Sequence, residues 1–359
     1  MVRAYYRKQH LGLRTHLDLI AELFGCDISM YPAHLATLNL AAREINDEAN
    51  YPRVVRRNFF DYVPSQPFCH VPDNAGGRQA IALPPLDAVV GNPPYVRQEK
   101  IEKDDKKRFG QIGTGAWPGL RLTGRSDLHC YFWPAATRLL KTNGYFGFLT
   151  SSSWLDVEYG FALQGWILRH FRILAIMESA AEPWFEDARV KTCVTILQRC
   201  DDEAQRMSNR VRFVRFSCKL SEMIGVPPTP EKEEARQTAV ESLRDLILSA
   251  DGDCQGEHWR IIVKTQQELW NDGVRAGMIL GDAQATESED ESAEDRKDDS
   301  QEESKSKGSL EGILDNYRAG KWGRYVRAPD LYFEIMRRFG KRFIALGEIA
   351  SIRFGVKSG

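Results

Sequence analysis

The sequence lacks long apolar runs and any recurring cysteine pattern. No apolar stretch approaches the ~20 residues of a membrane-spanning helix, and the first thirty residues lack the basic, apolar and small-residue order of a secretory signal peptide. The seven cysteines stand singly, without CxxC or Cys/His ligand spacing. This excludes a disulfide framework and a zinc site built from clustered ligands. We therefore expect a cytoplasmic protein with reduced thiols, no metal and no membrane contact.

The chain also carries little net charge, −1 overall, but that charge is unevenly distributed. Residues 281–307 hold eleven Asp or Glu against four Lys or Arg, a net charge of −7, which leaves +6 for the remainder. This acidic segment of low complexity is expected to be a disordered insert. A moderately basic body fits an anionic partner, although many enzymes without a nucleic-acid ligand are equally basic.

Apolar runs of strand length alternate with helical spacing over about the first 200 residues. Strands are expected at residues 23–28, 54–55, 86–90, 145–150, 173–177 and 193–197, and helices at 32–44 and 127–140. Residues 97–124 show no periodicity and are expected to cross the surface as a loop. This alternation predicts a mostly parallel α/β sheet, with Asp27, Asn58 and Asn92 at the carboxyl ends of its strands.

The pattern weakens after residue 200, and residues 201–280 are expected to form an α/β extension or linker. The elements expected there and beyond are a strand at 211–216, a polar linker entering a helix over 227–250, ordered structure at 322–325, a helix at 329–339 and a strand at 349–354.

One tetrapeptide, Asn92-Pro93-Pro94-Tyr95, directly follows the apolar run Leu86–Gly91. Prolines cannot extend a strand, so the chain must turn sharply and hold the Asn amide and the Tyr ring in a fixed relation. Out of context the tetrapeptide indicates no more than a turn, because Asn-Pro and Pro-Pro are common turn dipeptides. At the end of a buried strand, downstream of an acid-tipped strand, it indicates a site for a planar amine.

Methylation of an exocyclic amine needs this set of groups. The lone pair of adenine N6 is delocalised into the ring, so acceptors placed around its N–H bonds would free it and stabilise the positive charge that develops. The side-chain oxygen of Asn92 and the backbone carbonyl of Pro93 are such acceptors. The ring of Tyr95 can stack on a base that has been rotated out of a duplex.

These residues resemble the adenine-N6 DNA methyltransferases of bacterial type II restriction–modification systems, in their large Asn-Pro-Pro-Tyr subfamily. Gly25–Ile28 resembles the motif of that family that binds S-adenosylmethionine, which implies that Asp27 and Ile28 contact the cofactor, with Asp27 on the ribose hydroxyls. Asn58–Asp61 resembles the next motif, which implies that Asn58 accepts from the cofactor's adenine amine and that Phe59 packs on its ring. Aspartate is usual where Asn58 stands, and a shifted alignment would give the role to Asp61.

The resemblance continues beyond the tetrapeptide, which matches the family's catalytic motif in full. Asp127–Phe132 and Gly144–Thr150 are similar to its later helix and strand. Trp184–Asp187 is similar to the motif whose aromatic residue packs against the flipped base, a role this implies for Phe185; the alternative for Phe185 is ordinary core packing. Residues 321–325 and 346–359 resemble the entrance to a target-recognition domain.

The family's first motif, Asp-Pro-x-x-Gly-x-Gly, is missing upstream of Asp27, where Gly12 and Gly25 are the only candidate glycines. The resemblance therefore implies a Rossmann-like methyltransferase sheet that is incomplete at its N-terminus. The expected domains are a partial catalytic domain at 1–200, the extension at 201–280, the acidic insert at 281–307 and a truncated start of a target-recognition region at 308–359. The implied partners are double-stranded DNA and the missing N-terminal or C-terminal part of the same enzyme.

Two alternative functions stay open at this point. Asn-Pro-Pro-Tyr also occurs in methyltransferases that act on a protein glutamine or on RNA. In the second alternative, the chain is a catalytically dead remnant or one half of a split enzyme, able to bind partners without transferring methyl groups.

Overall fold

The computed structural model describes residues 1–12, 14–63, 66–73, 76–120, 122, 124–184, 191–287, 317, 320–344 and 346–350. Its strands are β1 (Phe24–Asp27), β2 (Arg53–Arg56), β3 (Cys69–Pro72), β4 (Arg78–Ile81), β5 (Leu86–Gly91), β6 (Leu140–Ser151), β7 (Phe171–Ser179), β8 (Thr192–Arg199), β9 (Arg210–Phe216), β10 (Cys254–Gln255) and β11 (Trp259–Thr265). Its α-helices are α1 (Val2–Leu11), α2 (His16–Ala21), α3 (Met30–Ala41), α4 (Lys103–Ala116), α5 (Leu128–Thr137), α6 (Glu158–His170), α7 (Glu203–Ser208), α8 (Leu220–Ile224), α9 (Glu233–Leu248), α10 (Gln266–Glu287), α11 (Gly323–Arg327), α12 (Asp330–Phe339) and α13 (Leu346–Ile349).

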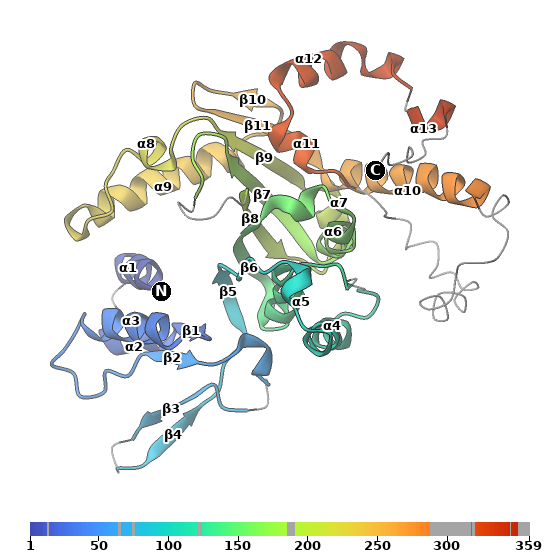
Figure 1. Cartoon of the computed structure of the whole chain (residues 1–359). Coiled ribbons are helices and arrows are strands. Elements are labelled where there is room, and N and C mark those ends of the chain that lie inside the picture. The colour runs from blue at the N-terminus through green and yellow to red at the C-terminus, as the bar shows by residue number, and fades with distance from the viewer. Residues whose placement is uncertain are drawn as a thin grey trace.

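The main sheet has seven strands in the order β10-β11-β9-β7-β8-β6-β5 (Figure 1). The expected strands at 86–90, 145–150, 173–177, 193–197 and 211–216 are all present as parts of β5 to β9. The prediction of a mostly parallel sheet is wrong. Of its six pairings only β5/β6 and β7/β9 are parallel, and the other four are antiparallel. Strand β8 follows β7 and lies between β6 and β7, antiparallel to both, which local sequence patterns do not reveal.

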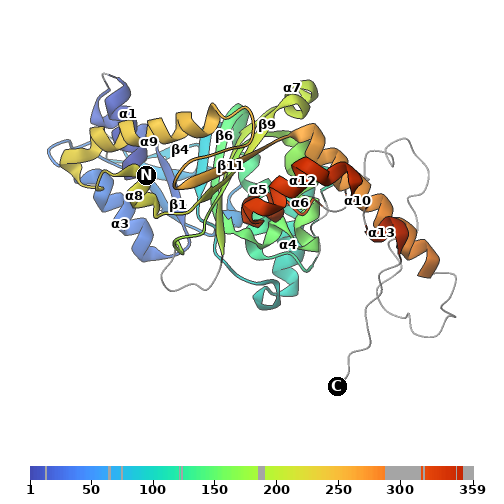
Figure 2. The ribbon, with the colours of Figure 1, turned by 90° about the horizontal axis from the view of Figure 1, so that it is seen from above.

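Helices cover both faces of this sheet, as expected for a Rossmann-like α/β fold (Figure 2). Strand β9 shows the division, because its side chains alternate between two cores. Val211 and Phe213 join the larger core, with α5, α6 and α10, whereas Val214 and Phe216 join a smaller core with α9. The expected division near residue 200 does not interrupt the sheet, since β9 and β11 continue it.

A second, two-stranded sheet contains β1 and β2, which pair in parallel and pack with α1 to α3. Figure 1 shows these elements on the β5 side of the main sheet. Among the described residues, β1 pairs only with β2 and β5 only with β6, so one edge of each strand lacks a strand partner. The edge strand β5 leaves Val90 83% exposed, although its sequence is typical of a buried strand.

The prediction of a surface loop over residues 97–124 is wrong, because helix α4 occupies much of this range. This helix buries Phe109 and Gly113 and packs along α5, and the Phe109 ring stacks on Phe60 with centroids 4.0 Å apart. Three glycines and a largely polar composition hide its periodicity in the sequence. Its contacts are with elements distant in sequence, which is why the local pattern failed to predict it.

The segment after the acidic insert belongs to the main core. Trp322 is fully buried, Tyr325 and Val326 are nearly so, and the backbone N–H of Trp322 donates to Leu155 O at 2.9 Å. The expected helix at 329–339 is present as α12.

Two further expectations fall mainly outside the described residues. Helix α10 runs to Glu287, so residues 281–287 of the expected disordered insert are helical, and residues 288–307 lie outside the description. The strand expected at 349–354 is contradicted at Ile349, which ends α13, and residues 351–354 are not described. Within the described ranges, no helix is both long and apolar enough to cross a lipid bilayer.

Candidate functional site

A cavity of about 600 Å³ lies between β1 and β5, where the carboxyl ends of the two strands meet η1 (Phe59–Asp61). It brings together most of the residues that the sequence singles out. Its lining includes Asp27, Ile28, Asn58, Phe59, Asn92, Pro93 and Pro94. Tyr95 lies on the other side of the corner, and Phe185 lies outside the described residues.

Polar groups at the ends of β1 and β2 line one part of this cavity. One carboxylate oxygen of Asp27 accepts a hydrogen bond from the Ser29 backbone N–H at 2.8 Å. The side-chain oxygen of Asn58 accepts from the Phe60 N–H at 3.1 Å and thereby caps η1. A carbonyl oxygen has two lone pairs, so Asn58 keeps a position for a second donor. Asp61 forms an ion pair with Arg108 and does not line the cavity, which favours Asn58 over the shifted alignment.

Phe59 gives the cavity a flat apolar wall. Its ring stacks on Phe132 with centroids 5.5 Å apart and an angle of 15° between the planes. Both rings line the cavity and pack against the main core, which fixes their orientation. A fixed aromatic wall beside a carboxylate and an amide is suited to an adenosine group, whose ring needs stacking and whose sugar and amine need acceptors.

The tetrapeptide begins where β5 passes under the ring of Phe148. A Cβ atom on Gly91 would lie only 2.9 Å from that ring, so the strand end requires glycine there. Pro93 is buried and Asn92 is exposed. The Tyr95 hydroxyl donates to Asn92 Oδ1 at 2.9 Å and lies 3.3 Å from Leu149 O. Burial raises the pKa of Tyr95 to about 12, so this hydroxyl stays a donor at neutral pH.

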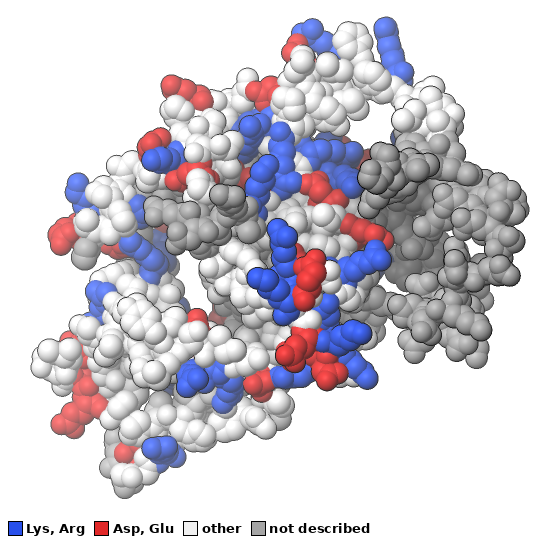
Figure 3. All heavy atoms as spheres, viewed as in Figure 1, with Lys and Arg blue, Asp and Glu red and all other residues white. Residues whose placement is uncertain are grey.

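A second cavity, of about 1070 Å³, lies on the Tyr95 side of the corner. The corner therefore forms a wall of both cavities, with Asn92 to Pro94 in the first and Tyr95 in the second. Basic residues lining the second cavity are Arg97, Arg125, Lys191 and Arg327. Figure 3 shows Lys and Arg side chains gathered across the middle of this face of the molecule, with carboxylates among them.

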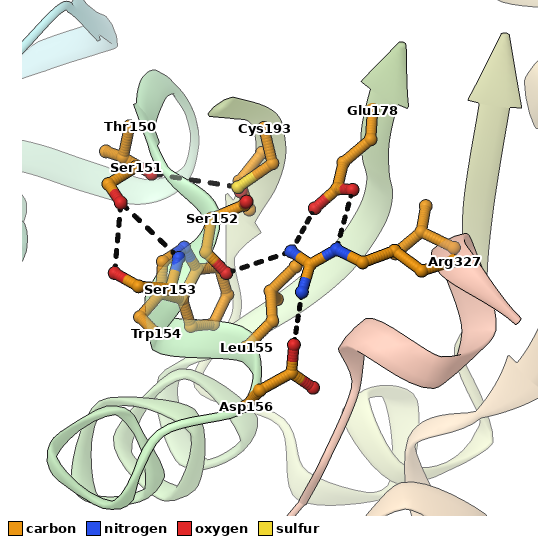
Figure 4. A network of polar contacts seen from close by, with 12 residues as sticks. Thr150, Ser151, Ser152, Ser153, Trp154, Leu155, Asp156, Glu178, Cys193 and Arg327 are labelled. Atoms are coloured by element: carbon orange, nitrogen blue, oxygen red, sulfur yellow. Dashed lines mark hydrogen bonds and ion pairs between the residues drawn. The ribbon is translucent and has the colours of Figure 1, made fainter. Parts of the chain in front are cut away.

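Arg327 ties the C-terminal part of the chain to this second cavity (Figure 4). Its guanidinium group contacts both carboxylate oxygens of Glu178, at 2.9 and 2.5 Å, and also Asp156 and the Ser152 carbonyl. Glu178 is only 7% exposed. One side chain from α11 thus holds the end of β7 against the turn that follows β6.

Some residues of the second cavity escaped the sequence analysis. A hydrogen-bonded chain joins Ser151, Ser153, Tyr159 and Asp127. The only signal in the sequence is the run of three serines after a strand, which is too common to single out a site.

Trp184, next to Phe185, packs against the smaller core. Within the described part of the chain, no group of three or more His, Cys, Asp or Glu side chains is placed to hold a metal ion.

Comparison with known proteins adds three findings. Residues 21–185 match the family model of the Eco57I restriction-modification methylase. The type II methyltransferase M.XamI of Xanthomonas campestris pv. amaranthicola is 39% identical over 140 residues, which are 37% of this chain and 25% of the relative. M.BanIII of Aneurinibacillus aneurinilyticus is 28% identical over 178 residues, which are 50% of this chain and 28% of the relative.

Among solved structures, a chain of a type I restriction–modification system superposes with a TM-score of 0.48 and 15% identity, over 95% of this chain and 59% of that one. The chain spans about a quarter of the length of the two curated relatives. The matched segment contains Asp27, Asn58 and the whole Asn92–Tyr95 corner. Residues 21–185 therefore resemble the methylase domain of type II restriction–modification enzymes.

Proposed function

We propose that this protein transfers a methyl group from S-adenosylmethionine to the N6 amine of an adenine that is flipped out of double-stranded DNA. One observation carries the proposal: the Asn92–Tyr95 corner is shared by two cavities, one with acceptors for a nucleoside and one with an aromatic ring and a basic lining. A donor on one side and an acceptor on the other would meet at Asn92.

The first cavity suits the adenosine half of S-adenosylmethionine, whose methyl group is bound to a sulfonium sulfur and is therefore easily transferred. Asp27 accepts from the ribose hydroxyls, and Ile28 covers the sugar. Asn58 accepts from the adenine amine, while Phe59 stacks on the ring. The support is the position of these four side chains around one cavity and the fixed orientation of the Phe59 ring.

The second cavity suits the target base. The ring of Tyr95 holds the base face-on, and Asn92 Oδ1 and the Pro93 carbonyl accept the two N–H bonds of its amine. Phe185 packs on the other face of the base. The cations along the cavity, Arg97 and Lys191 among them, contact backbone phosphates of the DNA.

The methionine half of the cofactor needs backbone that can approach it closely, and we propose that a further segment provides it. Both β1 and β5 contribute lining residues to the first cavity, and among the described residues each lacks a strand partner on one edge, so one more parallel strand between them would complete the sheet. Such a strand, followed by a glycine-rich turn, would come from a complementing segment or from a partner subunit. The exposure of Val90 on β5 supports this.

Cofactor titration tests the first cavity. Replacing Asp27 with Ala should weaken S-adenosylmethionine binding by roughly 10- to 100-fold, because a hydrogen bond to a charged group contributes about 1.5–3 kcal/mol. Asp61→Ala is the matched control, an acid of the same region that points away from the cavity. Isothermal titration or fluorescence measures both affinities.

Equal weakening by the two variants would contradict the role given to Asp27. If the unmodified chain shows no binding at millimolar ligand, this polypeptide does not hold the cofactor by itself. The same titration is then repeated with the complementing segment present.

A further inference from the structure

Four side chains in the second cavity form a continuous hydrogen-bonded chain that the proposed function leaves unused. Ser151 Oγ lies 2.9 Å from Ser153 Oγ, and Ser153 Oγ lies 2.6 Å from the Tyr159 hydroxyl. The Tyr159 hydroxyl in turn donates to Asp127 Oδ2 at 2.7 Å. These residues come from the end of β6, from η3 (Ser152–Leu155), from α6 and from the start of α5, and all four line the cavity.

The direction of each hydrogen bond follows from the carboxylate. An ionised Asp127 only accepts, so Tyr159 must donate its single proton to it. Ser153 then has to donate to Tyr159, and Ser151 has to donate to Ser153, because each hydroxyl has one hydrogen. Burial is the largest cause that raises the pKa of Tyr159, and the bond to Asp127 raises it further, so the hydroxyl keeps its proton.

With these directions, Ser151 Oγ is the open end of the chain. Its own hydrogen is donated to Ser153, and its oxygen can accept a further hydrogen bond. It accepts one long hydrogen bond, from the Ser153 backbone N–H at 3.4 Å. Ser151 is 8% exposed and shares the cavity with Tyr95. The Tyr95 hydroxyl reaches Leu149 O, two residues earlier on β6, so the open end lies roughly 7 Å along the strand from the corner.

A second buried polar side chain lies beside the same cavity. Among the described residues, His129 Nε2 has no hydrogen-bond partner, although the side chain is fully buried. Desolvation lowers the pKa of His129 to about 4, so the ring is neutral at pH 7. A cavity wall with an open hydroxyl acceptor suits a polar ligand rather than an apolar one.

We propose that Ser151 accepts the proton that the target amine loses on methylation, and that Ser153, Tyr159 and Asp127 pass it on. This rests on the proposed function. As the bond from N6 to the methyl carbon forms, the bond from sulfur to that carbon breaks and sulfur keeps its electron pair. The amine nitrogen becomes tetrahedral and holds one proton too many, and one of its two protons leaves the Pro93 carbonyl for Ser151 Oγ.

That proton moves to Ser151 Oγ while the Ser151 proton moves to Ser153, the Ser153 proton to Tyr159 and the Tyr159 proton to Asp127. The products are a neutral methylated amine, a thioether and a protonated Asp127. Asp127 is half-buried and returns the proton to solvent. Ser151 touches the substrate and is a catalytic residue, whereas Tyr159 and Asp127 act through it as positioning residues.

The chain also has a structural effect that the test must separate. Asp127 Oδ1 accepts from the backbone N–H of Gln98 at 3.0 Å, so Asp127 orders the segment that follows the corner. The test therefore uses Tyr159→Phe, which keeps the ring and removes only the hydroxyl, and Ser151→Ala with Ser151→Thr as the conservative rescue. Tyr145→Phe is the matched control, a half-exposed tyrosine on β6 that is remote from the chain.

Steady-state methyl transfer to duplex DNA provides the first readout. Tyr159→Phe and Ser151→Ala should lower kcat by roughly 100-fold while KM for DNA and cofactor stays within about twofold, because acid–base groups act on the chemical step. Ser151→Thr should recover most of kcat, and Tyr145→Phe should match the unmodified enzyme. A kcat within about twofold of normal in Tyr159→Phe overturns the relay.

Nucleoside binding provides a second readout that needs no methyl transfer. With S-adenosylhomocysteine filling the first cavity, the protein should bind adenosine tighter than purine riboside, which lacks the 6-amine, and the Ser151 contact should supply about fivefold of that preference, since one hydrogen bond contributes about 1 kcal/mol. Ser151→Ala should lose that fivefold part, while Asn92 and Pro93 keep the rest, and Ser151→Thr should keep all of it. Equal affinity for the two nucleosides in the unmodified chain, or an unchanged preference in Ser151→Ala, overturns the proposal. Absence of methyl transfer alone would count against the proposed function, and the nucleoside comparison would still decide the role of Ser151.

Discussion

Tyr95 has two expected roles, one for its ring and one for its hydroxyl, and the sequence alone indicates only the role of the ring. The ring was expected to stack on the target base, and the hydroxyl had no assigned role. The structure places the hydroxyl 2.9 Å from Asn92 Oδ1 and 3.3 Å from Leu149 O. Because the hydroxyl donates to the amide oxygen, the amide is held in one orientation before any substrate binds, which is the preorganisation that charge stabilisation requires.

Two substitutions at Tyr95 should therefore differ in how strongly they lower methyl transfer. Tyr95→Phe should lower the rate of methyl transfer by roughly 2- to 12-fold, since it removes one hydrogen bond of about 0.5–1.5 kcal/mol and keeps the ring. Tyr95→Ala should additionally lose about 1–3 kcal/mol of base stacking. Duplex DNA with 2-aminopurine at the target position measures the stacking part through its fluorescence. Equal binding of this DNA by Tyr95→Ala and the unmodified enzyme would contradict the stacking role.

At the scale of elements, the short helix α11 has more influence than its length suggests. In the sequence it is separated from the strands of the main sheet by the acidic insert, yet Trp322, Tyr325 and Val326 are in the main core. Gly323 fits directly against the Asp156 carboxylate, where a Cβ atom would overlap with its oxygens. Arg327 then fixes the turn after β6 that carries Ser151 and Ser153. Trp322 and helix α11 are therefore part of the main core.

Removing the Arg327 guanidinium should destabilise the whole domain. Arg327→Met leaves Glu178 buried without its countercharge, so the loss of unfolding free energy should be large, although below the ~3–5 kcal/mol of a fully buried pair because Arg327 is 29% exposed. Arg327→Met combined with Glu178→Gln should recover part of it. Urea unfolding measures these differences. Arg244→Met, which breaks an exposed pair with Asp245, is the control and should cost less than about 1 kcal/mol; equal losses at the two arginines would refute the argument.

Across the whole molecule, features set by residues close together in the sequence could be predicted, and features set by contacts between distant segments could not. The ends of β1, β2 and β5 were predictable because an apolar run followed by a polar residue is a local signal, and this placed Asp27, Asn58 and Asn92 around one cavity. Strand direction, helix α4 and the burial of Trp322 depend on contacts between distant segments, and these were missed. The relay residues were missed because serine and tyrosine acquire their role only when η3 and α6 bring them together.

Methyl transfer by an Asn92→Ala variant tests the central claim most directly, in enzyme reconstituted to activity with its complementing segment. The amide oxygen is the acceptor for the target amine, and loss of one such preorganised group typically costs about 100- to 1,000-fold in rate. Asn39→Ala is the control, at a half-buried asparagine of α3 whose side chain contacts only its own helix in the described structure. The account predicts loss of methyl transfer with S-adenosylmethionine affinity nearly intact. Substantial methylation of adenine by Asn92→Ala, or a loss of cofactor affinity that explains the lost activity, would contradict it.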